Sequence, residues 1–163
     1  METKTTLEEL PDDARVWIYQ SSRWLTPEES SLITKEVETF IAQWSAHGSK
    51  MKAASAVFHN RFVVVASSEA EVKASGCSID DSVHLLKRMG ALLGVDFFDR
   101  ITTLYYVGDQ IHESAIHSFW ALRKAGTVGP QTRVFNNLVK TLGEFRGMWI
   151  TEFENSWHNE MWK

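Results

Sequence analysis

The fold is decided by ARVWIYQSSRWLTPEES, residues 14–30, in which a strand signal is followed directly by a helix-start signal. Residues 14–22 are rich in β-branched and aromatic side chains, and apolar residues occupy both alternating sets, which predicts a strand with both faces covered. Thr26 can accept a free N–H of the first helical turn, and Glu29 completes a capping box three residues later. Pro27 stands at the first helical position, where its missing N–H costs nothing. We therefore predict a strand followed by a helix that begins at Pro27.

Working outward, the next segments predict a long helix, a hairpin and a second helix. Gly48 is placed to end the first helix. Two extended runs, 52–58 and 61–68, are joined at His59-Asn60, a two-residue connection typical of a hairpin. Ser78 and Asp81 form a second capping pair, and Gly94 ends the second helix. The apolar positions that recur at helical spacing are Ile33, Val37, Phe40, Ile41 and Trp44 in the first helix, and Ile79, Val83, Leu86, Met89 and Leu93 in the second.

A fourth strand, Ile101 to Val107, completes the order strand, helix, strand, strand, helix, strand. That order is typical of the ferredoxin-like βαββαβ fold, an antiparallel sheet with two helices on one face. We predict an α+β protein of one domain, 1–163, with an acidic N-terminal segment (1–13), this core (14–108) and a helical, Trp-rich C-terminal extension (109–163).

The extension contains two helix-like stretches and an aromatic stripe. Residues 113–126 and 132–145 have helical periodicity, and Trp149, Phe153, Trp157 and Met161 follow at intervals of four. Two interpretations stay open. The extension closes the open apolar face of the sheet, or Trp149, Phe153 and Trp157 form a homodimer interface.

Composition narrows the classes of partner. The chain has 163 residues and a net charge of −4, which disfavours phosphate attraction and hence nucleic acid. No apolar stretch is long enough to span a bilayer, and the start of the chain is acidic where a signal peptide would be basic and then apolar. We expect a cytoplasmic protein with no nucleic-acid or membrane partner.

The one cysteine, Cys77, stands between a small-residue turn and the second helix. In the predicted fold this helix start shares one end of the sheet with His47 and with 108–112, whereas His59 lies at the opposite end. Helix N–H groups at Ser75, Gly76, Cys77 and Ser78 could hold an anionic small ligand, or Cys77 could act as a nucleophile with His47 as base. Asp80 and Asp81 oppose both roles. The third interpretation is a buried cysteine that packs behind a capping box.

The spacing of residues argues against metal sites, nucleotide-binding loops and a serine-hydrolase elbow. His112 and His117 are five residues apart and would diverge on a helix, and no cysteine pair or carboxylate triad supports a metal site. Neither a G-x-x-x-x-G-K-[ST] loop nor a G-x-G-x-x-G turn occurs, and there is no G-x-S-x-G elbow. Gly126 and Gly129 are interpreted as a break between helices. We expect no metal and no cofactor. SWHNEMW, residues 156–162, presents His158 either as a ligand platform or as part of the docked chain end.

Six segments together resemble a known family: VWIYQSSRWLT, FIAQWSAHG, NRFVVV, SGCSIDDSV, GVDFFDR and SWH. They are similar to an uncharacterised family of cytoplasmic proteins from the Bacteroidetes, whose members often carry the label "ABC transporter ATPase". The match covers nearly the whole chain and implies a single-domain protein in which the SGCSID turn is a family feature. It carries over no catalytic residues. The phosphate loop and lysine that a transporter ATPase requires are missing from this sequence.

These observations predict a non-catalytic protein that binds a small ligand or a partner in a pocket lined by Ser75, Gly76, Cys77 and Ser78, with His47 nearby. The alternatives are a thiol-dependent enzyme that uses Cys77, and a structural or assembly protein that uses the C-terminal aromatic stripe.

Overall fold

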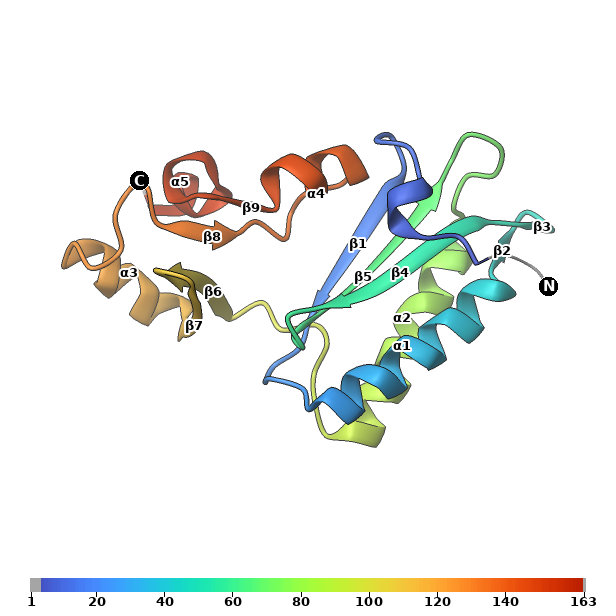
Figure 1. Ribbon diagram of the computed structural model, residues 1–163, viewed down its shortest axis with the longest axis horizontal. Coiled ribbons are helices and arrows are strands. Elements are labelled where there is room, and N and C mark those ends of the chain that lie inside the picture. The colour runs from blue at the N-terminus through green and yellow to red at the C-terminus, as the bar shows by residue number, and fades with distance from the viewer. Residues whose placement is uncertain (1–3, 163) are drawn as a thin grey trace. The chain divides into compact units, whose positions relative to one another are not determined.

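A computed structural model describes residues 4–162, and the chain forms two compact units where the sequence predicts one domain. The first unit is Met1–Asp99 with Lys140–Gly143, and the second is Arg100–Val139 with Glu144–Lys163. Both combine helices with antiparallel strands, so the α+β class is confirmed (Figure 1).

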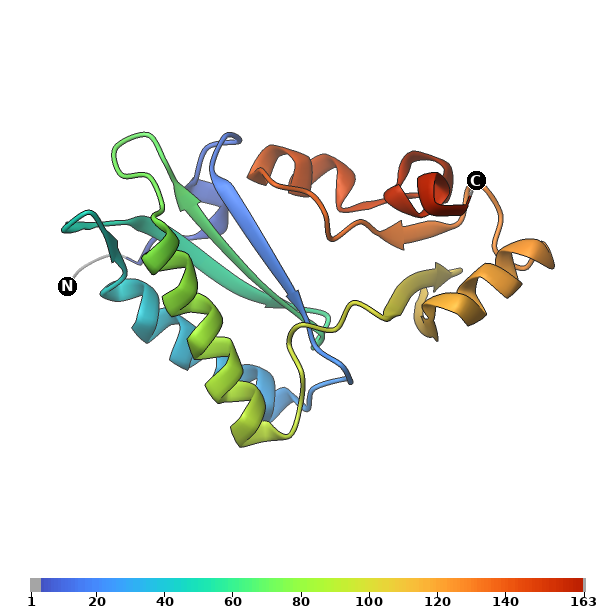
Figure 2. The same ribbon diagram turned by 180° about the vertical axis from the view of Figure 1, so that it is seen from behind.

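The first unit contains a three-stranded antiparallel sheet in the order β1-β5-β4, with α1 and α2 on one face (Figure 2). A short β2–β3 hairpin lies between α1 and β4, and the small helix η1 contacts β4. The elements are η1 (Leu7–Glu9), β1 (Arg15–Gln20), α1 (Pro27–Ala42), β2 (Ser45–Ala46), β3 (Ser49–Lys50), β4 (Lys52–Phe58), β5 (Phe62–Ser68) and α2 (Gly76–Leu93).

The start of α1 has the predicted capping box. Thr26 Oγ1 accepts a hydrogen bond from the Glu29 N–H at 3.1 Å, and the Thr26 N–H donates to Glu29 Oε1 at 2.9 Å. Arg23 donates from both Nη atoms to the same carboxylate at 2.9 Å each, which lowers the pKa of Glu29 to about 2. The helix ends at Ala42 and not at Gly48, because His47 and Gly48, both at positive φ, form the turn between β2 and β3.

The start of α2 lies three residues earlier than the predicted capping pair implies. Ser75 is the N-cap and Ser78 is the N3 residue, so the helix begins at Gly76 and the predicted Ser78–Asp81 pair does not cap it. Its end is confirmed, since Gly94 has φ of 70° and is the C-cap. The hairpin between β4 and β5 is also confirmed, with a turn of three residues, 59–61, rather than two.

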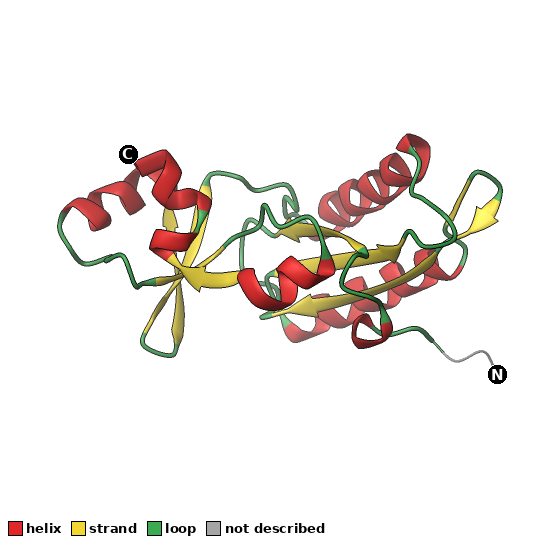
Figure 3. Cartoon of the chain, turned by 90° about the horizontal axis from the view of Figure 1, so that it is seen from above, coloured by secondary structure: helices red, strands yellow, loops and turns green. Residues whose placement is uncertain are grey.

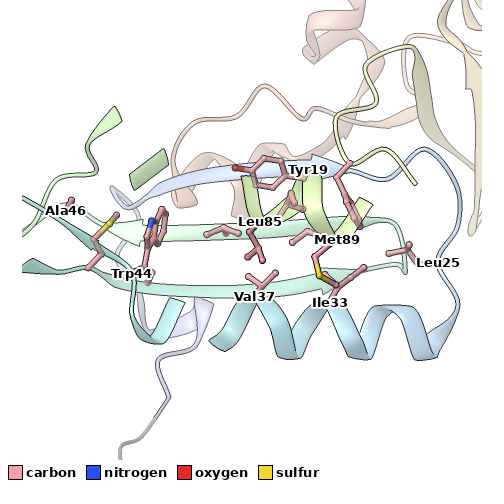
Figure 4. Packing of buried hydrophobic residues seen from close by; sticks show 14 residues of the cluster. Tyr19, Leu25, Ile33, Val37, Trp44, Ala46, Leu85 and Met89 are labelled. Carbon is pink, nitrogen blue, oxygen red and sulfur yellow. The ribbon is translucent and has the colours of Figure 1, made fainter. Parts of the chain in front are cut away.

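The core of the first unit lies between the sheet and the two helices, as Figure 4 shows from close by. Its centre is Ile33 and Val37 of α1 against Val63 and Val65 of β5, all at most 2% exposed. The full set of buried members is Tyr19, Leu25, Ile33, Val37, Trp44, Ala46, Met51, Ala53, Val63, Val65, Leu85, Leu86, Met89 and Phe97.

The ferredoxin-like topology is not confirmed, because the expected fourth strand does not join this sheet. That segment, β6 (Thr102–Val107), belongs to the second unit and pairs with β7 (Gln110–Ala115) across a two-residue turn. Pairing with a neighbour two residues away has the smaller loop-closure cost. The outer edge of β1 is met instead by 140–141, where the Val16 N–H donates to the Lys140 carbonyl at 3.0 Å.

The second unit has a four-stranded antiparallel sheet in the order β7-β6-β8-β9. Its core contains Phe119, Val134 and Phe153, each 0% exposed. Its remaining elements, coloured by type in Figure 3, are α3 (Ile116–Lys124), β8 (Arg133–Phe135), α4 (Leu142–Met148, whose first two residues belong to the first unit), β9 (Ile150–Glu152), η2 (Phe153–Asn155) and α5 (Trp157–Trp162).

Two predicted helices of the extension are corrected here. Residues 132–145 form strand β8, a loop and only the start of α4, and 113–115 belong to β7, so the helix predicted from residue 113 begins at Ile116. The interval of four among the late aromatics is not a helical stripe, because β9 and η2 interrupt it.

Candidate functional site

In the turn at the start of α2, which was predicted to bind a ligand, both serine hydroxyl groups make hydrogen bonds within the turn itself. Ser75 Oγ accepts from the Ser78 N–H at 3.0 Å, the Ser75 N–H donates to Ser78 Oγ at 2.8 Å, and Ser78 Oγ donates to the Ser75 carbonyl at 2.8 Å. Ser78 is buried, whereas Gly76 and Cys77 are exposed. The interpretation of Cys77 as a buried packing residue is therefore wrong.

The expected neighbours of Cys77 are only partly in place. Trp44, which follows α1, donates from Nε1 to the Ser78 carbonyl at 2.8 Å, so the end of α1 and the start of α2 do meet. His47 is exposed in the β2–β3 turn, and within residues 4–162 no hydrogen bond joins it to Cys77. Residues 108–112 lie in the β6–β7 hairpin, which belongs to the second unit.

Because its side chain is exposed, we expect Cys77 to react with a thiol reagent in the folded protein. Titration with a chromogenic disulfide should detect the one thiol of the chain without denaturant, at a rate close to that in urea. A Cys77→Ser variant is the blank. A thiol that reacts only after unfolding would contradict the exposed position.

A cavity of about 500 Å³ lies elsewhere in the first unit, between the C-terminal part of α1 and the first half of β4. Its volume is within the range typical of small-ligand sites. Three groups of residues line it: Lys4 and Thr5 before η1; Glu38, Ile41 and Ala42 of α1; and the consecutive run Lys50, Met51, Lys52, Ala53, Ala54 and Ser55. A consecutive run along a strand means that the backbone edge of β4 forms one wall.

The backbone groups on this edge can be assigned from the hydrogen bonds on the other side of the sheet. The Val16 N–H and the Gln20 carbonyl bond to segments outside the sheet, so even-numbered residues of β1 face away from β5 and odd-numbered ones face it. Trp17 is paired with Val65, so the odd-numbered residues of β5 direct their backbone groups toward β1 and the even-numbered ones direct theirs toward β4. Val64 is paired with Ala56, so the even-numbered residues of β4 direct their backbone groups toward β5.

The odd positions of β4 consequently direct their N–H and C=O groups away from the sheet. The Met51 N–H is taken by the Trp44 carbonyl at 2.9 Å. Beyond it, the outward groups of Ala53, Ser55 and Val57 have no backbone partner among the described residues. The edge is therefore unpaired over five residues, of which Ala53 is buried and Ser55 and Val57 are half-buried, and the cavity lies along the first three of the five.

The charges around the cavity are mostly positive. Lys4 forms an ion pair with Glu38 across it, while Lys50 and Lys52 are exposed. Three lysines and one glutamate leave a local charge of +2 in a chain whose net charge is −4. This site was not predicted from the sequence, where its one signal is a run of small residues, 53–56, directly after alternating lysines.

In the second unit, His158 is a buried histidine inside an aromatic cluster. Its ring stacks on Trp157 with centroids 3.9 Å apart and lies 5.6 Å from the Phe119 ring. Nδ1 is 2.7 Å from Ser156 Oγ, and Nε2 has no hydrogen-bond partner within residues 4–162. Burial lowers the pKa of His158 to about 4, so the ring is neutral at pH 7. Of the two interpretations of 156–162, the docked chain end fits this burial.

The residues predicted to form a dimer interface are largely inside the second unit. Trp149 is 4% exposed and packs on the Phe135 and Phe145 rings, and Phe153 is 0% exposed. Trp157 is half-buried. The first two side chains therefore cannot reach a partner, and the predicted aromatic stripe is corrected to an internal core.

His112 and His117 lie in different elements, His112 in β7 and His117 in α3. Over the described chain, no group of three or more His, Cys, Asp or Glu side chains could hold a metal ion. None of the helices within residues 4–162 has the length and apolarity needed to cross a bilayer.

The fold and cavity define an α+β protein with a groove beside an open strand edge. No family model, no curated protein and no solved structure matches the chain. The resemblance to the Bacteroidetes family stays a prediction.

Proposed function

We propose that this chain is a non-catalytic binding protein, and that its first unit holds a ligand or partner segment in the cavity between α1 and β4. The observation that carries the proposal is the coincidence of a 500 Å³ cavity with an open strand edge. An apolar wall of Ile41 and Ala42 would contact the body of the ligand, while outward N–H and C=O groups would fix its orientation.

This proposal keeps the binding role that the sequence predicts but moves the site. At the start of α2 the hydroxyls of Ser75 and Ser78 are engaged with each other's backbone groups, which leaves fewer donors for an anion. The cavity beside β4 combines apolar area, free backbone groups and positive charge within one unit of the chain.

Neither alternative function gains support from an observation of its own. A thiol-dependent enzyme would require a base close to Cys77, and His47 makes no hydrogen bond to it within the described chain. An assembly role for the aromatic stripe would require exposed rings, whereas Trp149 and Phe153 are buried.

Filling the cavity should weaken ligand binding without unfolding the protein. We expect Ala42→Phe to reduce the affinity for an anionic naphthalene-sulfonate dye by about tenfold or more, because the new ring occupies the apolar wall. The measurement is a fluorescence titration at pH 7, with circular dichroism as the check on folding.

The matched control is Ala91→Phe, which puts the same ring at an exposed alanine of α2 that does not line the cavity. Its dye affinity should equal that of the wild type. Equal affinities for all three proteins would contradict the proposed site.

A further inference from the structure

We infer that the occupant of the groove beside β4 is an extended acidic peptide segment of another protein, which joins the sheet as a strand antiparallel to β4. This inference rests on the proposed function and names the class of partner for the same cavity.

The backbone edge identifies the kind of occupant. Ala53, Ser55 and Val57 present outward N–H and C=O groups at every second residue, so donors and acceptors repeat about every 7 Å along the edge. A compact small molecule can meet one such pair, whereas an extended peptide backbone repeats at the same spacing and meets all of them. Strand addition to a free sheet edge is an established mode of peptide recognition.

The walls of the groove fit the side chains of an added strand. Alternate residues of such a strand point to opposite faces of the sheet. One set would face α1, where Ile41 and Ala42 offer an apolar surface, and the other set would face away from the helices (Figure 2). The α1 side therefore favours apolar residues at alternate positions.

Charge selects an acidic segment over a second copy of this chain. The lining residues carry a local charge of +2, with Lys50 at the end of β3 and Lys52 at the start of β4. An antiparallel partner would bring its C-terminal part to these lysines, so its acidic residues belong there. A second copy paired antiparallel through β4 would bring the C-terminal part of its own β4, with Val57 and Phe58, to these lysines and would offer them no carboxylate.

The experiment uses the full chain and a fluorescein-labelled peptide of about eight residues, close to the usual length of a strand. Threonine and valine alternate in this peptide, and two glutamates stand near its C-terminus. Fluorescence anisotropy measures the affinity. A peptide with lysines in place of the glutamates, and one with N-methyl groups on alternate amides, should each bind about tenfold more weakly or worse.

Variants of the protein test the same β4 edge independently of the peptide variants. Ser55→Pro removes an N–H that points away from β5, so the ladder with β5 stays intact while the added strand loses a donor. We expect about a tenfold loss of affinity. Ser55→Ala keeps the N–H and should bind like the wild type. Lys50→Glu with Lys52→Glu should reverse the preference between the acidic and lysine peptides.

The N-methylated peptide keeps the test valid if Ser55→Pro fails to fold, since it uses the wild-type protein. Equal affinity for the methylated and unmethylated peptides would overturn the inference. So would a dimer in sedimentation that Ser55→Pro dissociates, because the occupant of the edge would then be a second copy. If dye binding still responds to Ala42→Phe while no peptide binds, the inference fails and the proposed function stands.

Discussion

Replacing Phe119 by alanine should lower the free energy of unfolding by about 3–5 kcal/mol. The Phe119 side chain is 0% exposed, and its ring lies 5.3 Å from Tyr105 and 6.0 Å from Phe153. Three elements of the second unit, β6, α3 and η2, therefore meet on this one ring. Truncation loses the transfer free energy of the ring and leaves a cavity that the surrounding rings fill only in part.

Urea unfolding followed by circular dichroism gives this value. Leu138→Ala is the control in the same unit, because that side chain is 64% exposed and should change stability by no more than about 0.5 kcal/mol. A loss below about 1 kcal/mol for Phe119→Ala would show that the ring is not the centre of the second core.

Lowering the pH from 7 to 4 should cost the protein up to about 3 kcal/mol through His158 alone. The buried ring has a pKa of about 4, against 6.5 for the exposed side chain. Between these values the unfolded chain binds a proton that the folded chain does not. Stability is thus fully present above pH 6.5 and is lost as the pH falls toward 4.

The pH experiment compares wild type with His158→Phe, which keeps an aromatic ring and removes the titrating group. Other groups also shift, since burial lowers the pKa of His59 and Arg23 lowers that of Glu29, but they are the same in both proteins. His47→Asn, at an exposed position with φ of 54°, is the histidine control and should follow the wild-type profile. Parallel profiles for wild type and His158→Phe would contradict the buried neutral ring.

Much of the first unit could be predicted from local signals. The capping box of Thr26 and Glu29, the periodic apolar face of α1, the hairpin turn at His59 and the left-handed Gly94 each act within a few residues. Local signals also misplaced elements. The start of α2 is capped by Ser75 and Ser78, which form a capping box of two serines, and not by the predicted pair of Ser78 and Asp81.

The cavity beside β4 was not predicted from the sequence. A binding role was expected at Cys77, yet the cavity lies beside β4, because its walls come from three segments distant in sequence: Thr5, Ile41 and Ser55. The hydrophobic periodicity of a sequence does not indicate which strand lies at the edge of a sheet. That depends on which segments pair with β1, and 140–141 do so from far along the chain.

The sequence by itself determined the α+β class, the strand–helix–hairpin–helix order of the first unit, the start of α1 and the end of α2, since caps, turns and amphipathic periods are short-range. Only the tertiary structure decided that Thr102–Val107 leaves the first sheet, that the chain forms two units, and that Trp149 and Phe153 are buried inside the second unit. Strand partners and burial depend on long-range contacts, whose free energies compete across the whole chain and leave no local pattern.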